Sequence, residues 1–224
     1  MIKLNGVHKH FHIGEQTVRA LDGINLQVTA GEFVAVMGRS GSGKTTLLNM
    51  LGCMDQPSKG EFWLDGVNVA SLDDDELSAI RNSKLGFVFQ SFHLLNRMTT
   101  LENILLPLQY DHHQQHPEGE QRAIELLNRV GLGDRLEHKP NELSGGQRQR
   151  VAVARALINK PSVILADEPT GNLDSTTSKA IMGLLESLHK EGQTIVMVTH
   201  ENDIAASASR VINMLDGRIT GDSK

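Results

Sequence analysis

A glycine-rich segment near the N-terminus carries the residue types needed to hold phosphate groups. Residues 38–45 read Gly-Arg-Ser-Gly-Ser-Gly-Lys-Thr and lie between the apolar run Phe33–Met37, an expected strand, and the helical run Thr46–Leu51. Glycines let several backbone N–H groups point at phosphate oxygens, and the helix start adds the positive end of its dipole. Lys44 is placed to neutralise β- and γ-phosphates, and Thr45 to offer a hydroxyl to Mg²⁺. The expected phosphate-binding residues are Gly38, Arg39, Ser40, Gly41, Ser42, Gly43, Lys44, Thr45 and Thr46.

A second segment ends an apolar run in two adjacent carboxylates. Residues 163–168 read Val-Ile-Leu-Ala-Asp-Glu, the pattern of a buried parallel strand whose carboxyl end opens onto a ligand site. Because adjacent strand residues face opposite ways, we expect Asp167 and Glu168 to have different roles. Asp167 is expected to hold Mg²⁺ through its water shell, and Glu168 to orient and deprotonate an attacking water.

A third segment begins a helix with small residues. Ser144 precedes Gly145 and Gly146, and the following residues, Gln147–Leu157, are good helix formers with apolar positions at helical spacing. Ser144 is expected to be the N-cap, and the glycines to expose backbone amides. This pattern predicts a second helix start able to bind an anion.

These segments together resemble those of the ATP-binding cassette ATPases. The resemblance covers almost the whole chain and implies ATP as the substrate and Mg²⁺ as the cofactor. It also implies a homodimer formed on ATP binding, in which the signature residues close over the γ-phosphate held by the opposite subunit. Those residues are Ser144, Gly145, Gly146 and Gln147.

Other positions match the family in the expected order. Gln90 resembles a loop glutamine that touches Mg²⁺ and the water, and His200 a histidine that contacts the γ-phosphate. Asp174 ends the segment Gly171–Asp174, which resembles the loop through which two subunits of the family sense each other. Phe11 lies where the family places an aromatic residue that stacks on adenine. The resemblance therefore implies catalytic roles for Glu168, His200, Gln90 and Lys44, and a metal site formed by Thr45, Gln90 and Asp167.

The fold is expected to be α/β, a P-loop NTPase core of the ABC ATPase type with a mixed central sheet. One domain over residues 1–224 is predicted, in which 1–90 and 144–224 form the core with an N-terminal antiparallel β subdomain, and about 91–143 form an inserted α-helical subdomain. Strands are expected over 2–7, 18–28 and 61–69, a helix opening over 72–77, and a hairpin at 210–217.

Composition narrows the classes of function. The net charge of -5 and the pI of about 6.0 provide no basic surface for phosphate backbones, so we expect no nucleic-acid partner. The sequence has no run of about 18 apolar residues, shows no signal segment at its start and contains a single cysteine, Cys53. These features favour a cytoplasmic location.

Several stretches look like the macrolide-export, lipoprotein-release and cell-division branch of the family, in other words like MacB, LolD and FtsE. They are residues 51–55, 86–90, 143–150 and 165–174. The resemblance implies a separate integral-membrane permease with a large extracytoplasmic domain, a further periplasmic adaptor, and a peripheral position on the cytoplasmic face of the inner membrane. A regulatory, non-transporting ATPase of the cell-division kind is the main alternative. A DNA-maintenance ATPase fits less well because long heptad arms are absent.

Two further features have competing interpretations. His8, His10 and His12 alternate along an expected strand, and residues 111–116 form a second histidine-rich patch; solvated surface is the expected interpretation, with metal binding as the alternative. Phe92, Leu94 and Leu95 follow Gln90 and are expected either to line a socket for a permease helix or to be core of the helical subdomain.

Overall fold

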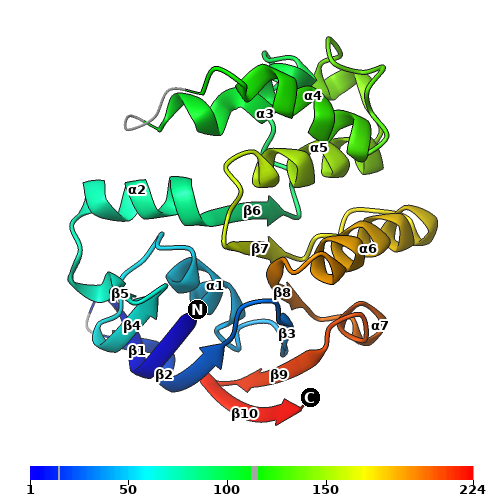
Figure 1. Cartoon of the computed structure of the whole chain (residues 1–224). Coiled ribbons are helices and arrows are strands. Elements are labelled where there is room, and N and C mark those ends of the chain that lie inside the picture. The colour runs from blue at the N-terminus through cyan, green and yellow to red at the C-terminus, as the bar shows by residue number, and fades with distance from the viewer. Residues whose placement is uncertain (15, 112–115, 224) are drawn as a thin grey trace.

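A computed structural model of the chain describes residues 1–14, 16–111 and 116–223. Figure 1 shows helices α3, α4 and α5 gathered on one side of the molecule and strands β1, β2, β4 and β5 on the opposite side, with β6 and β7 between them and β9 and β10 on the side of β2. Both ends of the chain lie on the side of the strands (Figure 1). The strand-rich and helix-rich parts of the sequence are thus separated in space.

The central sheet contains six strands in the described part of the chain, in the order β10-β9-β3-β8-β7-β6. Neighbours from β9 to β6 are parallel, whereas β10 forms an antiparallel hairpin with β9, as the sequence predicts. Buried apolar side chains fill β3, β7 and β8, as expected for strands covered on both faces, whereas β10 at the edge has no buried residue. The bounds of the strands in this sheet are β3 (Phe33–Met37), β6 (Leu85–Phe89), β7 (Val163–Asp167), β8 (Thr194–Thr199), β9 (Arg210–Leu215) and β10 (Arg218–Ser223).

The second sheet is antiparallel in the pairs described and has the order β2-β1-β4-β5. Strands β1 (Ile2–Ile13) and β2 (Gln16–Val28) extend the expected segments toward each other. The expectation of one strand over 61–69 is wrong, because a turn at Asp65, where φ is +49°, and Gly66 divides it. The chain forms β4 (Lys59–Leu64), β5 (Val67–Asn68) and then the short 3₁₀ turn η1 (Val69–Ser71).

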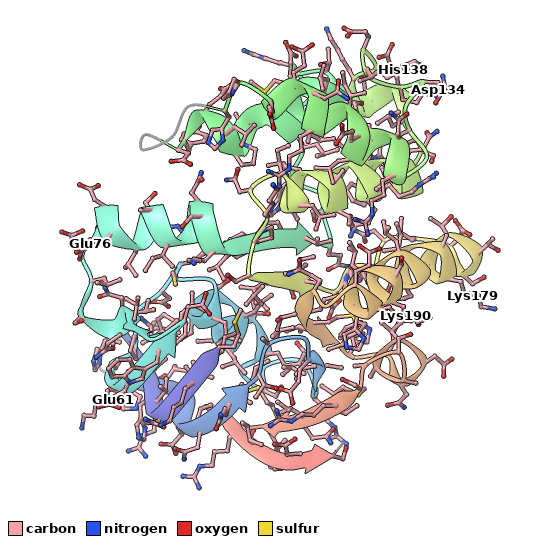
Figure 2. The ribbon with its side chains drawn as sticks, in the orientation of Figure 1. Glu61, Glu76, Asp134, His138, Lys179 and Lys190 are labelled. Atoms are coloured by element: carbon pink, nitrogen blue, oxygen red, sulfur yellow. The ribbon has the colours of Figure 1, made fainter. Side chains whose placement is uncertain are left out.

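Helices pack around the central sheet. Helix α1 (Lys44–Leu51) follows β3, α6 (Ser175–Lys190) follows β7, and α7 (Asn202–Ala205) follows β8. Helix α2 (Asp74–Lys84) begins at the acidic run seen in the sequence, with Asp73 and Glu76 forming a capping box. In Figure 2, Glu76 projects from the free end of α2, and Lys179 and Lys190 project from α6.

A separate helical layer has its own buried core. Helices α3 (Thr100–Gln109), α4 (Gly119–Arg129) and α5 (Gly145–Leu157) pack around apolar side chains such as Ile104, Leu127 and Val151, and the 3₁₀ turn η2 (Pro140–Glu142) leads into α5. Asp134 and His138 mark the outer edge of this layer, whereas Glu61 on β4 marks the opposite end of the molecule (Figure 2).

Among the helices of the described residues, none is long and apolar enough to cross a membrane. Within the same part of the chain, no three His, Cys, Asp or Glu side chains lie together as a metal site would require. His8 instead pairs with Asp22 at 3.1 Å, and its ring meets that of His10 edge-on. His112 and His113 of the second patch lie outside the described residues.

Candidate active site

The phosphate loop connects β3 to α1 at the carboxyl edge of the central sheet. Gly43 is the N-cap of α1 and has a φ of 99°, which favours glycine. A Cβ there would lie 2.5 Å from the carbonyl oxygen of Ala20, so β2 packs directly against the loop. The Nζ atom of Lys44 donates to the carbonyl oxygens of Gly38 at 2.8 Å and Arg39 at 3.0 Å. Lys44 is therefore held over the loop although its side chain is cationic and nearly buried.

Two distant turns anchor this loop. The carbonyl oxygen of Ser42 accepts a hydrogen bond from Gly217 N–H at 3.0 Å, and the carbonyl oxygen of Gly217 accepts one from Asp22 N–H at 2.9 Å. Gly217 belongs to the β9–β10 turn, and Asp22 belongs to β2. The loop conformation is thus fixed by both sheets as well as by its own glycines.

Glu168 lies just beyond the end of β7. Its φ is +43°, a left-handed value that is uncommon for a residue with a side chain. Its backbone N–H donates to Val198 O at 2.9 Å, and its Oε1 atom lies 2.8 Å from Nδ1 of His200, the residue after β8. We expected Asp167 and Glu168 to point in opposite directions because side chains alternate along a strand. That reason is wrong, because the strand ends between them and the backbone turns at Glu168.

Asp167 is the last residue of β7 and is partly buried. Burial is the main cause that raises the pKa of its carboxyl group, and the Glu168 carboxylate raises it further. The Lys44 ammonium acts in the opposite direction. The anionic form of Asp167 is therefore disfavoured here, and a cation at this edge of the sheet would stabilise it.

A hollow of about 1190 Å³ lies beside the phosphate loop. Glu168 and His200 face it, together with eight residues of the loop and α1 start: Gly38, Arg39, Ser40, Gly41, Gly43, Lys44, Thr45 and Thr46. Ser42 is buried beneath the loop. Further lining residues were not predicted from the sequence, namely Val18, Arg19, Ala20, Met37, Asn202, Asn213, Asp216 and Gly217.

Phe11 does not line this hollow in the described structure. It lies next to it, because its strand partner in the β1–β2 ladder is Val18, which does. Phe11 is 40% exposed, and the Lys9 ammonium lies 5.2 Å from the centre of its ring. A stacking role for Phe11 stays a prediction.

The segment after Glu168 surrounds Gln90. The Nε2 atom of Gln90 donates to Oδ1 of Asn172 at 3.3 Å, and Nδ2 of Asn172 donates to the carbonyl oxygen of Gln90 at 3.1 Å. Asp174 is the N-cap of α6, and hydrogen bonds from Thr177 are the main cause that lowers the pKa of its carboxyl group. Within the described structure, neither Gln90 nor Asp174 lines the hollow.

The start of α5 lies apart from the hollow in the part of the chain that the structure describes. Ser144 is the N-cap, as expected, and forms a capping box with Gln147. Gly145 lies beside Leu173, but Gly146 is buried, and a Cβ there would come 2.3 Å from Cγ2 of Thr177. The expectation that both glycines expose their amides is therefore only partly met, since Gly146 lets α6 approach.

Residues 21–171, more than half of the chain, match the family model described as ABC transporter. The chain belongs to the ABC transporter family. The matched residues of this cassette include the phosphate loop, Gln90, Ser144–Gln147 and Glu168, while His200 lies beyond them.

The cassette is also similar to individual curated proteins. It is 54% identical over 224 residues to the macrolide export ATP-binding/permease protein MacB of Chlorobium phaeobacteroides, covering all of this chain and 34% of that protein. It is 50% identical to the uncharacterized ABC transporter ATP-binding protein YvrO of Bacillus subtilis, covering all of this chain and 97% of that protein. The chain thus spans about a third of the macrolide export relative.

Solved structures agree with the fold. The ATP-binding cassette MJ0796, solved as a dimer in a post-hydrolysis state bound to ADP and Pi, superposes with a TM-score of 0.91 and 47% identity, covering 100% of this chain and 98% of that one. The cbiO1 chain of Clostridium perfringens, part of the ABC transporter complex cbiONQ, superposes with a TM-score of 0.86 and 29% identity. The match covers 99% of this chain and 87% of that one. The predicted fold and ATPase class of the cassette are confirmed.

Proposed function

We propose that this cassette binds ATP in the hollow beside the phosphate loop and hydrolyses it with Glu168 as the general base, within a homodimer that drives a membrane permease. The observation that carries the proposal is the position of Glu168. Its carboxylate faces the same hollow as the phosphate loop and is held at 2.8 Å by His200. A carboxylate beside a phosphate-binding helix start repels the phosphate and so does not help to bind it. It can instead accept a proton from water.

The proposed chemistry uses four side chains of the chain. Lys44 exchanges its bonds to the loop carbonyls of Gly38 and Arg39 for bonds to the β- and γ-phosphates. Glu168 orients water and accepts its proton as the water oxygen attacks the γ-phosphorus. The bond from that phosphorus to the β–γ bridging oxygen breaks, and ADP leaves with that oxygen. His200 holds the carboxylate through Nδ1, and its Nε2 atom reaches the γ-phosphate as a donor only when the ring is protonated. Gln90 is the proposed contact to the water, brought in when the dimer closes.

The residues at this edge of the sheet fit Mg²⁺. Thr45 presents a hydroxyl to the hollow, and the pKa of Asp167 is raised mainly by burial, so its anionic form lacks solvation that a cation would supply. Mg²⁺ typically takes one or two protein oxygens and fills its other positions with phosphate and water. Thr45 and Asp167, with Gln90, are the proposed holders, and the ion would neutralise charge on the β- and γ-phosphates.

The start of α5 is proposed to complete the site of a second copy. Ser144 is exposed and lies outside the hollow of its own chain in the described structure, so its helix start has no phosphate to bind there. The similarity to a dimeric cassette that holds ADP and Pi supports the same arrangement for this chain. Ser144, Gly145 and Gln147 then contact the γ-phosphate across the interface, and Asp174 orders the start of α6 beside them.

An apolar groove of about 400 Å³ is the proposed site for a helix of the permease. It lies between α2, β6 and α3 and is lined by residues including Met54, Phe87, Phe89 and Tyr110. Of the two expectations for Phe92, Leu94 and Leu95, the core of the helical subdomain is met for Leu94, and a socket for a permease helix at these residues stays a prediction. Leu94 packs against the core of the helical layer, Leu95 is exposed outside the groove, and His93 lines it.

The groove also has a charge preference. Arg81, His93 and Arg155 line it, and the described lining residues include no Asp or Glu. Both arginines donate hydrogen bonds to backbone carbonyl oxygens. Arg81 donates to Cys53 O at 2.7 Å and Arg155 to Phe92 O at 2.9 Å. The proposed occupant is therefore an apolar helix that carries a carboxylate. Because Phe89 and His93 flank Gln90, this helix would sense movements at the nucleotide.

The relatives named for macrolide export support an export role over a regulatory one. We place the cassette on the cytoplasmic face of the membrane, working with a separate permease that has an extracytoplasmic domain and with a periplasmic adaptor. No nucleic-acid partner is proposed.

Hydrolysis by the Glu168→Gln variant tests the proposed function. The amide keeps the size of the side chain but cannot accept the proton, so turnover should fall by at least about a hundredfold while ATP still binds. An ATP-dependent dimer should then persist in size-exclusion chromatography. Near wild-type phosphate release by this variant would refute Glu168 as the base.

A further inference from the structure

Gln149 is a fully buried polar residue of α5. Its Nε2 atom donates to the carbonyl oxygen of Pro169 at 2.7 Å, and its Oε1 atom has no hydrogen-bond partner among the described residues. A buried polar atom without a partner is unfavourable, and an apolar side chain of similar length would fill the same space without it. The specific contribution of Gln149 is therefore its hydrogen bond to Pro169.

Pro169 directly follows Glu168, whose backbone is in a left-handed conformation. Such a conformation is costly for a residue with a side chain and persists where its surroundings fix it. Three hydrogen bonds fix this turn, from Glu168 N–H to Val198 O at 2.9 Å, from Gly171 N–H to Glu168 O at 3.0 Å, and from Gln149 to Pro169 O. The first ties the turn to β8, the second closes the turn on itself, and the third ties it to α5.

Helix α5 connects this third bond to the other end of the site. Gln149 lies five residues after the N-cap Ser144, about 7.5 Å along a helix. A shift of the helix start is therefore carried to Gln149, and from Gln149 to the turn that aims the Glu168 carboxylate. Misplacing a catalytic group by about 1 Å can cost a hundredfold in rate.

We propose that Gln149 is a positioning residue that makes the aim of Glu168 depend on the position of α5. The inference rests on the proposed function, in which Ser144 contacts the nucleotide of the other copy while Glu168 acts on the nucleotide of its own. Gln149 then links the two sites of a dimer within one chain. Nucleotide bound at one site sets the general base at the other.

A matched pair of glutamine substitutions tests the positioning role. Gln149→Met keeps the length of the side chain and removes the hydrogen bond. Gln193→Met is the control, because Nε2 of Gln193 also donates to a prolyl carbonyl, Pro161 O at 3.1 Å, but at the opposite end of β7. Gln149→Met should lower kcat about tenfold or more with KM for ATP within about twofold, whereas Gln193→Met should change neither beyond twofold. Equal losses in both variants would overturn the proposal.

A double-mutant cycle with Glu168→Gln asks whether Gln149 acts through Glu168. If it does, adding Gln149→Met to Glu168→Gln should not lower the residual rate further. Multiplied losses would overturn the inference and leave the proposed function intact, whereas a Glu168→Gln variant with wild-type turnover would refute the proposed function itself.

A second variant covers the case in which Gln149→Met does not fold. Gln149→Glu keeps the shape of the side chain and can donate to Pro169 O only when its carboxyl group is protonated. Its kcat relative to that of the wild type should rise as the pH is lowered. A ratio that does not change with pH contradicts the proposal.

Discussion

The imidazole of His200 and the carboxylate of Glu168 lie 2.8 Å apart at the carboxyl edge of the central sheet, although they follow different strands. The Glu168 side chain is the more buried of the two, so the exposed histidine closes over it from the solvent side. A neutral imidazole has one N–H. If Nδ1 carries that hydrogen, His200 donates it to the carboxylate and Nε2 has none to donate. Holding the base and contacting phosphate are therefore competing tasks for His200.

We expect His200→Ala to lower kcat about tenfold to a hundredfold, because Glu168 loses the group that orients it. His200→Gln should retain more activity, since its amide can still donate to the carboxylate. The measurement is steady-state phosphate release with ATP affinity determined separately. His138→Ala, at the outer edge of the helical layer in Figure 2, is the control and should behave as the wild type. Equal activity of His200→Ala and the control would show that His200 does not orient Glu168 for hydrolysis.

The raised pKa of Asp167 predicts a pH-dependent stability. Its carboxyl group ionises less readily in the folded chain than at the usual value of 3.8, with burial as the main cause. Folding therefore loses stability as the pH rises above that value. Asp167→Asn should raise the Tm of the nucleotide-free protein at pH 7, and the gain should shrink as the pH falls and be lost below 3.8.

Adding MgATP should reverse this order, because the ion stabilises the anionic carboxylate of the wild type and not the amide. Thermal melts of both proteins at several pH values, with and without MgATP, make the comparison. A wild-type Tm above that of Asp167→Asn in the nucleotide-free state at pH 7 would contradict the assignment.

The groove predicts a variant that uncouples the cassette from its permease. Tyr110 lines the groove and is 65% exposed, so Tyr110→Glu should leave the fold and basal ATPase activity unchanged. It should abolish co-purification with the permease, because the new carboxylate repels the acidic residue proposed for the docking helix and a polar group replaces an apolar contact. Leu95→Glu is the matched control, an exposed apolar residue outside the groove. Loss of binding in Leu95→Glu alone would place the docking site elsewhere.

Local segments of the site were predictable because their chemistry is local. The phosphate loop, the N-cap Ser144 and the β9–β10 hairpin depend on neighbouring residues and appear in the structure as expected. Val18 and Asp216 line the hollow only because two sheets meet at the phosphate loop, and no residue near them in sequence indicates this. Such contacts depend on tertiary packing.

Other differences arise where backbone geometry departs from regular patterns. Strand alternation does not extend to Glu168, because its φ of +43° ends β7. His93 also has a positive φ, +47°, which interrupts any regular spacing after Gln90 and leaves Leu94 in the helical core instead of the groove. Apolar spacing alone cannot show such breaks.

A shared active site is the central claim, and mixing two inactive variants tests it most directly. Lys44→Ala removes the phosphate contact of the loop. Ser144→Asp keeps the N-cap of α5, since Asp caps helices well, but places a negative charge where the γ-phosphate of the other copy would lie.

Each variant alone should be nearly inactive, because both sites of its homodimer are damaged. A mixed dimer contains one site with an intact loop and an intact α5 start, so phosphate release should return on mixing and rise with protein concentration. The account predicts recovery to about a quarter of the wild-type rate, since random pairing makes half of the dimers mixed, each with one of two sites. No recovery at any mixing ratio, or full activity of Ser144→Asp alone, would contradict the shared site.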